Sequence, residues 1–203
     1  MKLYFSPGTC SLSPHIVLRE AGLPFSLEKV DTKAGKTAGG ADFKAINPKG
    51  YVPVLELDDG LALTEGAVIV QYLADQSPQA NLAPKAGSHE RLRMQELLNY
   101  IATEIHKGFG PLFNRKLTDD AKATLRGVLT AKFDYLVKLL GSRQFISGDQ
   151  FSVADAYLFT VLNWSGHAGI ELSGWPALAD YHKRIGARPA VRAALEAEGL
   201  LRS

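Results

Sequence analysis

The first eighty residues alternate between strand-like and helix-like hydrophobic patterns. The apolar run KLYF ends at Pro7-Gly8, and SPHIVLREAG then carries apolar residues at helical spacing until Gly22. FSLEKV alternates like a strand. The runs YVPVLEL and LAL flank an Asp-Gly pair, which supplies the backbone conformation that tight hairpin turns require. The pattern predicts a β-α-β segment followed by a β-hairpin.

Two further segments complete this half of the chain. Residues 32–42 are rich in Gly, Lys, Thr and Ala, which predicts a loop or a short irregular helix. TEGAVIVQYLADQSP predicts a helix with Thr64 as its N-cap and Pro78 beyond its end. The first half is therefore α/β in class.

The second half carries helical patterns and no convincing strand. Leu97, Ile101, Ile105 and Phe109 recur at every fourth position and form one apolar stripe of a long helix. Further helices are predicted by DDAKATLRGVLTAKFDYLVKLLG and WPALADYHKRIGARPAVRAALEAEGLL, the last of them broken at Pro189. With a boundary in the loop-like stretch 78–87, we predict an α/β domain over residues 1–80 and an all-α domain over residues 87–203.

One helix start in the second half is unusually well marked. In GDQFSVADAYLFTVLNW, Ser152 and Asp155 have the spacing of a capping box, and Phe151 stands where a hydrophobic staple would. The helix beyond it is apolar almost all round, which predicts that it lies in the core of its domain. We interpret this motif as part of the fold and not of a site.

Composition and charge exclude several classes of function. The 203 residues are 46% hydrophobic and 22% charged, as in ordinary globular proteins. The formal charge of +2 and the absence of a dense basic block argue against nucleic-acid binding. The N-terminal segment turns at Pro7 before a long apolar stretch develops, so we expect neither a signal peptide nor a membrane span. The single cysteine cannot form an internal disulfide, which fits a cytoplasmic protein.

That cysteine, Cys10, has two possible interpretations. Free cysteines are usually buried and unreactive, so composition alone indicates that Cys10 only fills space in the core. Its setting favours chemistry, because a turn followed by a helix places the sulfur near unpaired backbone N–H groups and the positive end of the helix dipole, which stabilise a thiolate. The neighbouring Ser11 either caps the helix or adds a hydroxyl donor at the same place.

Several of these stretches together resemble one protein family. They are SPGTCSLSPHIVLRE, NPKGYVPVLELDDG, LTEGAVIVQYLAD and LNYIATEIHKGFGPLF. In this order they resemble the cytosolic glutathione S-transferases, and among these the bacterial beta class, which has a cysteine at the start of the first helix. The resemblance runs over essentially the whole chain. It implies a thioredoxin-like N-terminal domain, an all-helical C-terminal domain, a homodimer, glutathione as co-substrate and no metal.

The resemblance also implies the residues of a site. Cys10 and His106 would be the catalytic residues, with His106 near the sulfur as hydrogen-bond donor or acid/base group. The proline that matches Pro53 is cis in this family, so that Val52 presents its backbone to glutathione. The implied glutathione-binding residues are Cys10, Ser11, Lys36, Val52, Pro53, Glu65, Gly66, Asn99, Thr103, Glu104, His106 and Lys107. Those from the long helix would partly serve the opposite subunit.

Simpler interpretations stand beside these assignments. Glu65 is a favourable acid in the first turn of a helix, whereas a helix N-terminus with an acid also suits the γ-glutamyl end of glutathione. Asn99, Thr103 and His106 form a stripe that an ordinary solvated helix face would also show. A proline at position 53 is also compatible with an edge or bulge of a strand.

The sequence departs from the family pattern at three positions. Phe5 replaces a common tyrosine and Tyr4 points to the other face of the strand, so no phenol hydroxyl is expected near the thiol. Gly35 occupies the position where the family has a lysine, and the lysines near this position are Lys33 and Lys36. Of these two, we expect Lys36 to replace the family's lysine. Gly66 lacks the serine hydroxyl often found there.

The predicted function follows from the resemblance. We expect a glutathione transferase that directs the glutathione thiolate at small hydrophobic electrophiles. The alternatives are thiol-disulfide exchange or reductive dehalogenation through Cys10, and a non-catalytic stress or regulatory protein of the same fold. The candidate walls of the electrophile pocket, which are equally typical of core positions, are Phe109, Phe113, Tyr157, Trp164 and His167.

Overall fold

The computed structural model describes residues 1–201, which form two compact units. The first unit contains residues 1–83 and the chain from Arg188 onward, and the second contains residues 84–187. The last helix therefore packs with the first unit, whereas the sequence-based division placed it in residues 87–203. No helix among the described residues is long and apolar enough to cross a membrane.

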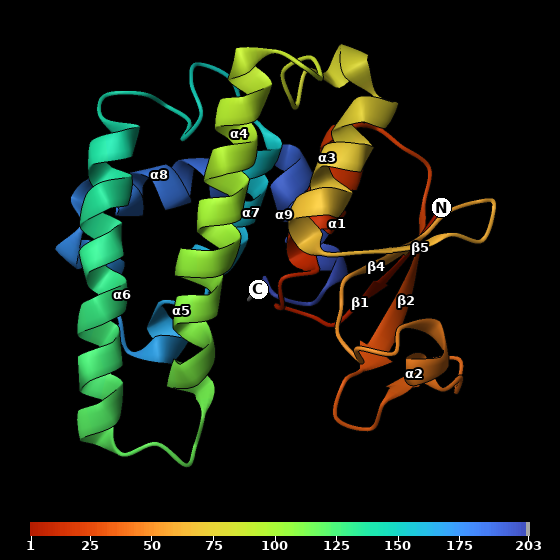
Figure 1. The fold of residues 1–203 in the computed structure, drawn as a ribbon, viewed down its shortest axis with the longest axis horizontal. Coiled ribbons are helices and arrows are strands. Elements are labelled where there is room, and N and C mark those ends of the chain that lie inside the picture. The colour runs from red at the N-terminus through yellow and green to blue at the C-terminus, as the bar shows by residue number, and fades with distance from the viewer. Residues whose placement is uncertain (202–203) are drawn as a thin grey trace. The chain divides into compact units, whose positions relative to one another are not determined.

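The first unit is built on a mixed five-stranded sheet (Figure 1). Its spatial order is β3-β2-β1-β4-β5, with β1 and β2 parallel and the other neighbours antiparallel. The strands are β1 (Lys2–Phe5), β2 (Ser26–Asp31), β3 (Lys36–Thr37), β4 (Val54–Glu56) and β5 (Ala62–Thr64).

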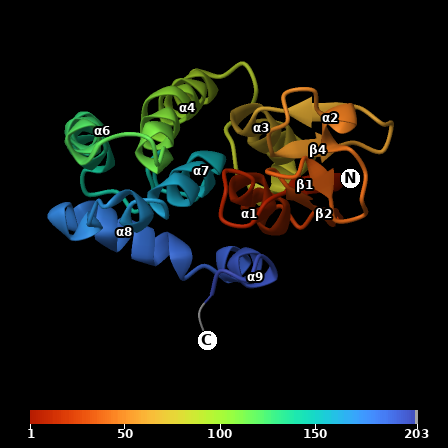
Figure 2. The same cartoon turned by 90° about the horizontal axis from the view of Figure 1, so that it is seen from below.

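Helices cover both faces of this sheet, because β1 carries apolar side chains on both faces that must be buried. Tyr4 packs with Phe43 in a buried cluster on one face, and Phe5 on the opposite face packs against His15 of the first helix. The helices of this unit are α1 (Leu12–Glu20), α2 (Phe43–Ile46), α3 (Gly66–Gln76), the 3-10 helix η1 (Pro78–Ala80) and α9 (Pro189–Ala197). Figure 2 shows α9 beside α1, and the two helices are in contact.

The β-α-β segment and the hairpin are confirmed, and two details of the prediction are wrong. The stretch 32–42 contains the strand β3, which at two residues is too short to show an alternating pattern. Helix α3 begins at Gly66 with Glu65 as its N-cap, because Thr64 still pairs in β5.

The second unit consists of helices. They are α4 (His89–Tyr100), the π-helix η2 (Ile101–His106), α5 (Lys107–Phe109), η3 (Gly110–Phe113), α6 (Asp119–Leu140), α7 (Val153–Leu162), η4 (Gly166–Ala168), η5 (Leu172–Gly174) and α8 (Pro176–Gly186). All residues of α7 are buried, as predicted. The apolar stripe from Leu97 to Phe109 is buried as well, although the π-helical turn inside it was not predicted. The break before Pro189 is confirmed.

The capping box at the start of α7 is also confirmed. The Asp155 carboxylate accepts hydrogen bonds from the Ser152 backbone N–H at 2.9 Å and the Ser152 hydroxyl at 2.8 Å. Phe151 is buried, with its ring edge-on to Phe145. The motif fixes where the central helix of this unit begins.

Candidate functional site

Cys10 lies in a tight loop between β1 and α1. The loop closes on itself through backbone hydrogen bonds from Thr9 N–H to Ser6 C=O at 3.2 Å and from Leu12 N–H to Thr9 C=O at 3.1 Å. Cys10 is half-buried, and its thiol donates to the Val52 carbonyl oxygen at 3.3 Å. The sulfur therefore lies at the start of α1, against the backbone of the segment that precedes β4.

The side chain of Ser11 holds this loop together. Its hydroxyl donates to the Ser6 carbonyl at 3.1 Å, accepts from the Ser6 N–H at 3.1 Å and lies 2.9 Å from the Thr9 hydroxyl. Ser11 is fully buried and makes no side-chain hydrogen bond to the helix that it precedes. Helix capping, one of its two expected roles, is thus not what this hydroxyl does.

The Val52-Pro53 peptide bond is cis, as the resemblance implied. Pro53 also faces the start of α3, since a Cβ built on Gly66 would lie 3.9 Å from the Pro53 Cγ, an ordinary contact. A serine side chain at position 66 would therefore fit. The fold brings Cys10, Val52, Pro53 and Gly66 together although they come from three parts of the sequence.

Glu65 at the N-terminus of α3 has an unusual backbone conformation. Its φ of 68° lies in the left-handed region, which is unfavourable for a residue with a side chain and is often retained at functional sites. The Lys49 ammonium reaches the Glu65 carboxylate at 2.6 Å and the Thr64 hydroxyl at 2.8 Å. Lys49 was missed by the sequence analysis, because only the fold brings it to a partner 16 positions away.

Lys36 occupies a different part of the sheet. It lies in β3 at the sheet edge, paired in register with Asp31 of β2, and its side chain is exposed. Strand β2 separates β3 from β1, the strand that leads into the Cys10 loop. Contact between Lys36 and a ligand beside Cys10 remains a prediction.

In the second unit, the polar candidates lie on and next to the π-helical turn. Asn99, Thr103 and Lys107 are exposed, and the Thr103 hydroxyl donates to the Asn99 carbonyl at 3.0 Å. The Lys132 ammonium contacts the Glu104 carboxylate at 2.6 Å and the Glu104 carbonyl at 3.2 Å. Turns of this π-helical kind are frequent at functional sites.

His106, at the end of that turn, belongs to an aromatic cluster. Its Nδ1 lies 2.8 Å from the Tyr157 hydroxyl, and its ring is edge-on to Trp164 with centroids 4.9 Å apart. Phe109 and Phe113 each pack edge-on against Trp164, with centroids 5.8 and 6.2 Å away. The structure thus unites four of the five predicted pocket aromatics around His106.

These aromatic side chains differ in exposure. Phe109 and Tyr157 are 0% and 3% exposed, so they belong to the core, whereas Phe113 is 46% exposed. His106 and Trp164 are half-buried. His167 lies in η4 with an exposed side chain, apart from the ring contacts that define the cluster. An electrophile could reach the cluster only through its partly exposed members.

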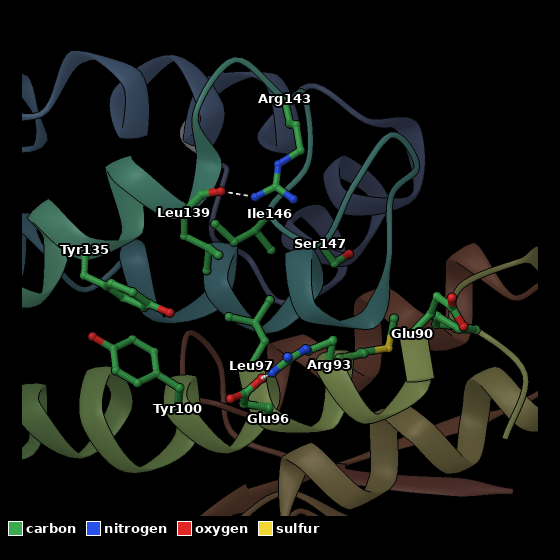
Figure 3. A pocket seen from close by; sticks show the side chains of 12 residues that line it. Glu90, Arg93, Glu96, Leu97, Tyr100, Tyr135, Leu139, Arg143, Ile146 and Ser147 are labelled. Atoms are coloured by element: carbon green, nitrogen blue, oxygen red, sulfur yellow. Dashed lines mark hydrogen bonds and ion pairs between the residues drawn. The ribbon is translucent and has the colours of Figure 1, made fainter. Parts of the chain in front are cut away.

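A separate pocket of about 740 Å³ opens in the second unit between α4, α6 and the segment after α6 (Figure 3). Figure 3 shows Tyr100 and Tyr135 next to each other in the pocket, and their rings are edge-on with centroids 5.0 Å apart. Burial, with Tyr135 and Glu104 nearby, raises the pKa of Tyr100. The guanidinium of Arg143 bonds to the Leu139 carbonyl, and Arg93 pairs with Glu96 at 2.8 Å. None of the candidate residues from the sequence lines this pocket.

The same chain matches known proteins along its whole length. Residues 8–76 match the family model for the glutathione S-transferase N-terminal domain, and residues 100–189 match that for the C-terminal domain. The glutathione S-transferase GstA of Escherichia coli O157:H7 is 47% identical over 98% of this chain and 100% of its own. A sphingomonad glutathione S-transferase solved with glutathione is 47% identical, with a TM-score of 0.95 over 99% of this chain and 100% of its own.

The chain therefore belongs to the glutathione S-transferase family, and it has that family's two-domain fold. Its place within the family follows from a second solved structure. The Sphingomonas chungbukensis enzyme, which is described as a bacterial beta class transferase, is 47% identical with a TM-score of 0.95 over 99% of this chain and 100% of its own. The chain is a beta class glutathione transferase, as the sequence motifs indicated.

Proposed function

We propose that this enzyme binds glutathione beside Cys10 and joins it, through its thiolate sulfur, to small hydrophobic electrophiles. The observation that carries the proposal is the gathering of the Cys10 thiol, the Val52 carbonyl and the N-terminus of α3 around Pro53. A helix N-terminus suits a carboxylate, and a free backbone edge suits a peptide. Glutathione offers both, and a relative has been solved with glutathione bound.

Five of the candidate residues receive a role in this proposal. The γ-glutamyl carboxylate would bind the N–H groups at Gly66, and the Glu65 carboxylate would receive the γ-glutamyl ammonium. The backbone of Val52 would pair with the cysteinyl unit, which places the glutathione sulfur beside Cys10. His106 would donate a hydrogen bond toward that sulfur region.

The chemistry is a displacement at the electrophile. The glutathione thiol gives its proton to water, and the thiolate attacks the carbon that bears the leaving group. A C–S bond forms, the C–halogen bond breaks, and the electron pair leaves with the halide. The partly exposed rings of Phe113 and Trp164 would bind an aryl halide, and the physiological role would be detoxification.

We also propose a homodimer in which Asn99 and Glu104 of each subunit help complete the site of the other. Glutathione binding and oligomeric state should then be linked. Sedimentation at low micromolar protein concentration should show a dimer. A monomer that binds glutathione fully would contradict the shared site.

Retention on immobilised glutathione, followed by assays with an aryl halide and with a mixed disulfide, tests the function. The wild type should be retained and should conjugate the aryl halide. His106→Ala should lower kcat/KM about 100-fold if the imidazole assists the sulfur, whereas His89→Ala, at an exposed position on α4, should have no effect. A protein that is neither retained nor active would contradict the proposal.

Cys10→Ala separates conjugation from disulfide exchange. With oxidised glutathione the wild type should form a mixed disulfide, visible as one glutathione per chain by intact mass, because no second cysteine is present to resolve it. The variant should lose this adduct and keep conjugation. Loss of both activities would instead make Cys10 the nucleophile, an alternative that the names of the relatives do not favour.

A further inference from the structure

A buried carboxylate from the end of the chain reaches the loop that carries Cys10. Glu198 follows α9, and its side chain is completely buried. One carboxylate oxygen lies 2.9 Å from Nδ1 of His15 in α1, and the other accepts the Gly8 N–H at 3.0 Å. Gly8 stands two residues before Cys10 in the same loop. We call the set Glu198, His15 and Gly8 the Glu198 node.

The direction of the hydrogen bonds in this node is fixed by Arg19, which lies next to it. The Arg19 Nε–H can only donate, and it lies 3.0 Å from Nε2 of His15. His15 Nε2 is therefore the acceptor, and Nδ1–H donates to Glu198. The imidazole is held between the rings of Phe5 and Phe25, with centroids 6.2 and 5.7 Å away. Glu198 is thus oriented by a side chain that is itself locked in place.

The hydrogen bond between Glu198 and the Cys10 loop depends on the backbone conformation of Gly8. Its φ of 70° is a conformation that glycine adopts easily, and this conformation presents the N–H to Glu198. A Cβ on Gly8 would lie 3.4 Å from Leu200, so the chain after α9 packs on the same loop. Ser11 binds this loop from within, and Glu198 binds it from another part of the chain.

We propose that Glu198 is a positioning residue for the Cys10 thiol. Its carboxylate holds the Gly8 N–H and thereby sets where the loop places the sulfur relative to the Val52 carbonyl. A hydrogen bond to a buried charge is stronger than one between neutral groups, so a single such contact can fix a short loop. The consequence for catalysis rests on the proposed function, whereas the effect on the thiol itself does not.

The chain contains a matched control for this proposal. Arg188 pairs with Glu20 through two hydrogen bonds of 2.7 and 2.9 Å, and this pair also joins α9 to α1. It lies at the other end of both helices, away from the node. Glu196 is a second control, because it is an exposed acid on α9 itself.

The test is the rate at which Cys10 reacts with an aromatic disulfide reagent, followed against pH on the native protein. Cys10 is the only cysteine, so the signal belongs to one position. Glu198→Gln keeps the shape and removes the charge, and we expect the rate constant to rise about tenfold as the loop is released. Glu20→Gln should lower the unfolding temperature and leave the rate at the wild-type value. Glu196→Gln should change neither.

The outcomes are distinct. A wild-type rate profile in Glu198→Gln would overturn the proposal, as would equal increases in Glu198→Gln and Glu20→Gln, which would mean that stability alone controls the thiol. If Glu198→Gln does not fold, Glu198→Asp takes its place, because it keeps the charge but is too short to reach both partners. A wild-type rate constant for Cys10 in Glu198→Asp would then overturn the proposal. Absence of conjugation in every variant would refute the proposed function and leave this comparison valid.

Discussion

Among residues 1–201, each of the two units contains one carboxylate side chain that is fully buried and accepts several hydrogen bonds, and the two differ in where their partners lie in the sequence. Asp155 in the second unit accepts from Ser152, Ile146 and Tyr181, which are 3, 9 and 26 positions away. Glu198 in the first unit accepts from His15 and Gly8, which are 183 and 190 positions away. The first arrangement has a local motif in the sequence, and the second has none.

The two carboxylates also differ in what surrounds them. Burial raises the pKa of Asp155, although its hydrogen bonds oppose the shift. Burial and the neighbouring Asp155 raise the pKa of Tyr181 well above its usual range, so its hydroxyl stays a donor at every pH of interest. Asp155 thus receives two backbone N–H groups and two hydroxyls, whereas Glu198 receives one backbone N–H and one imidazole. We expect the fold to depend more on Asp155.

Asp155→Ala should have the largest effect. It leaves the Ile146 and Ser152 N–H groups and the Tyr181 hydroxyl buried without their acceptor, which should lower the free energy of unfolding by about 3–5 kcal/mol. Denaturant titration followed by tryptophan fluorescence reports on this unit, because Trp164 and Trp175 are the only tryptophans. Asp149→Ala, at an exposed position nearby, is the control. A loss below about 1 kcal/mol would contradict the assigned importance of the carboxylate.

Glu198→Ala should have a smaller effect on stability. The Gly8 N–H belongs to a half-buried loop that water can reach, so we expect a loss of about 1–3 kcal/mol. Denaturant titration followed by far-ultraviolet circular dichroism, which does not depend on the reactivity of Cys10, measures this loss. If this variant were more damaging than Asp155→Ala, the ranking of the two carboxylates would have to be reversed.

The sequence was most informative where structure is local. The Ser152–Asp155 box, the apolar stripe through Ile101 and Ile105, and the Asp-Gly hairpin each occupy one short window, and all three are confirmed. The two-residue strand β3 and the π-helical turn η2 were missed. A strand of two residues has no measurable period, and the burial pattern of η2 is that of an α-helix.

The candidate site shows the same limit. The setting at a helix start singled out Cys10, and the resemblance implied the cis bond before Pro53 and the backbone of Val52 as part of the site. Lys49 and Glu198 were not predicted, because their contacts are created only by the fold. Backbone groups carry no signature in the sequence, and a glutamate near the end of a chain looks like any exposed acid. Long-range contacts of this kind are established by packing and not by local propensity.

Tyr181→Phe would sharpen the comparison within the Asp155 site. It removes one of the hydroxyls that donate to Asp155 and leaves the backbone donors in place, so we expect a loss of about 1–2 kcal/mol in the free energy of unfolding. The measurement is the same denaturant titration. An effect as large as that of Asp155→Ala would mean that the tyrosine, and not the capping box, is the dominant contact.

The smallest effect is expected at His182, a half-buried histidine that contrasts with the fully buried His15. His182 in α8 stacks on Phe159 with centroids 4.7 Å apart, and its Nε2 lies 2.7 Å from the Asn163 amide oxygen, which is a neutral group. Burial lowers the pKa of His182 from its usual value of 6.5. As the pH falls below that value, the unfolded chain takes up the proton first, and the stabilising contribution present at higher pH is progressively lost.

Unfolding temperatures measured by tryptophan fluorescence between about pH 7 and pH 5 test this contrast. The wild type should lose stability toward the acid end, and His182→Gln should lose less over the same interval, whatever its stability at neutral pH. His89→Gln, at an exposed position, should retain the wild-type slope. Identical slopes in His182→Gln and the wild type would show that the half-buried ring does not titrate there.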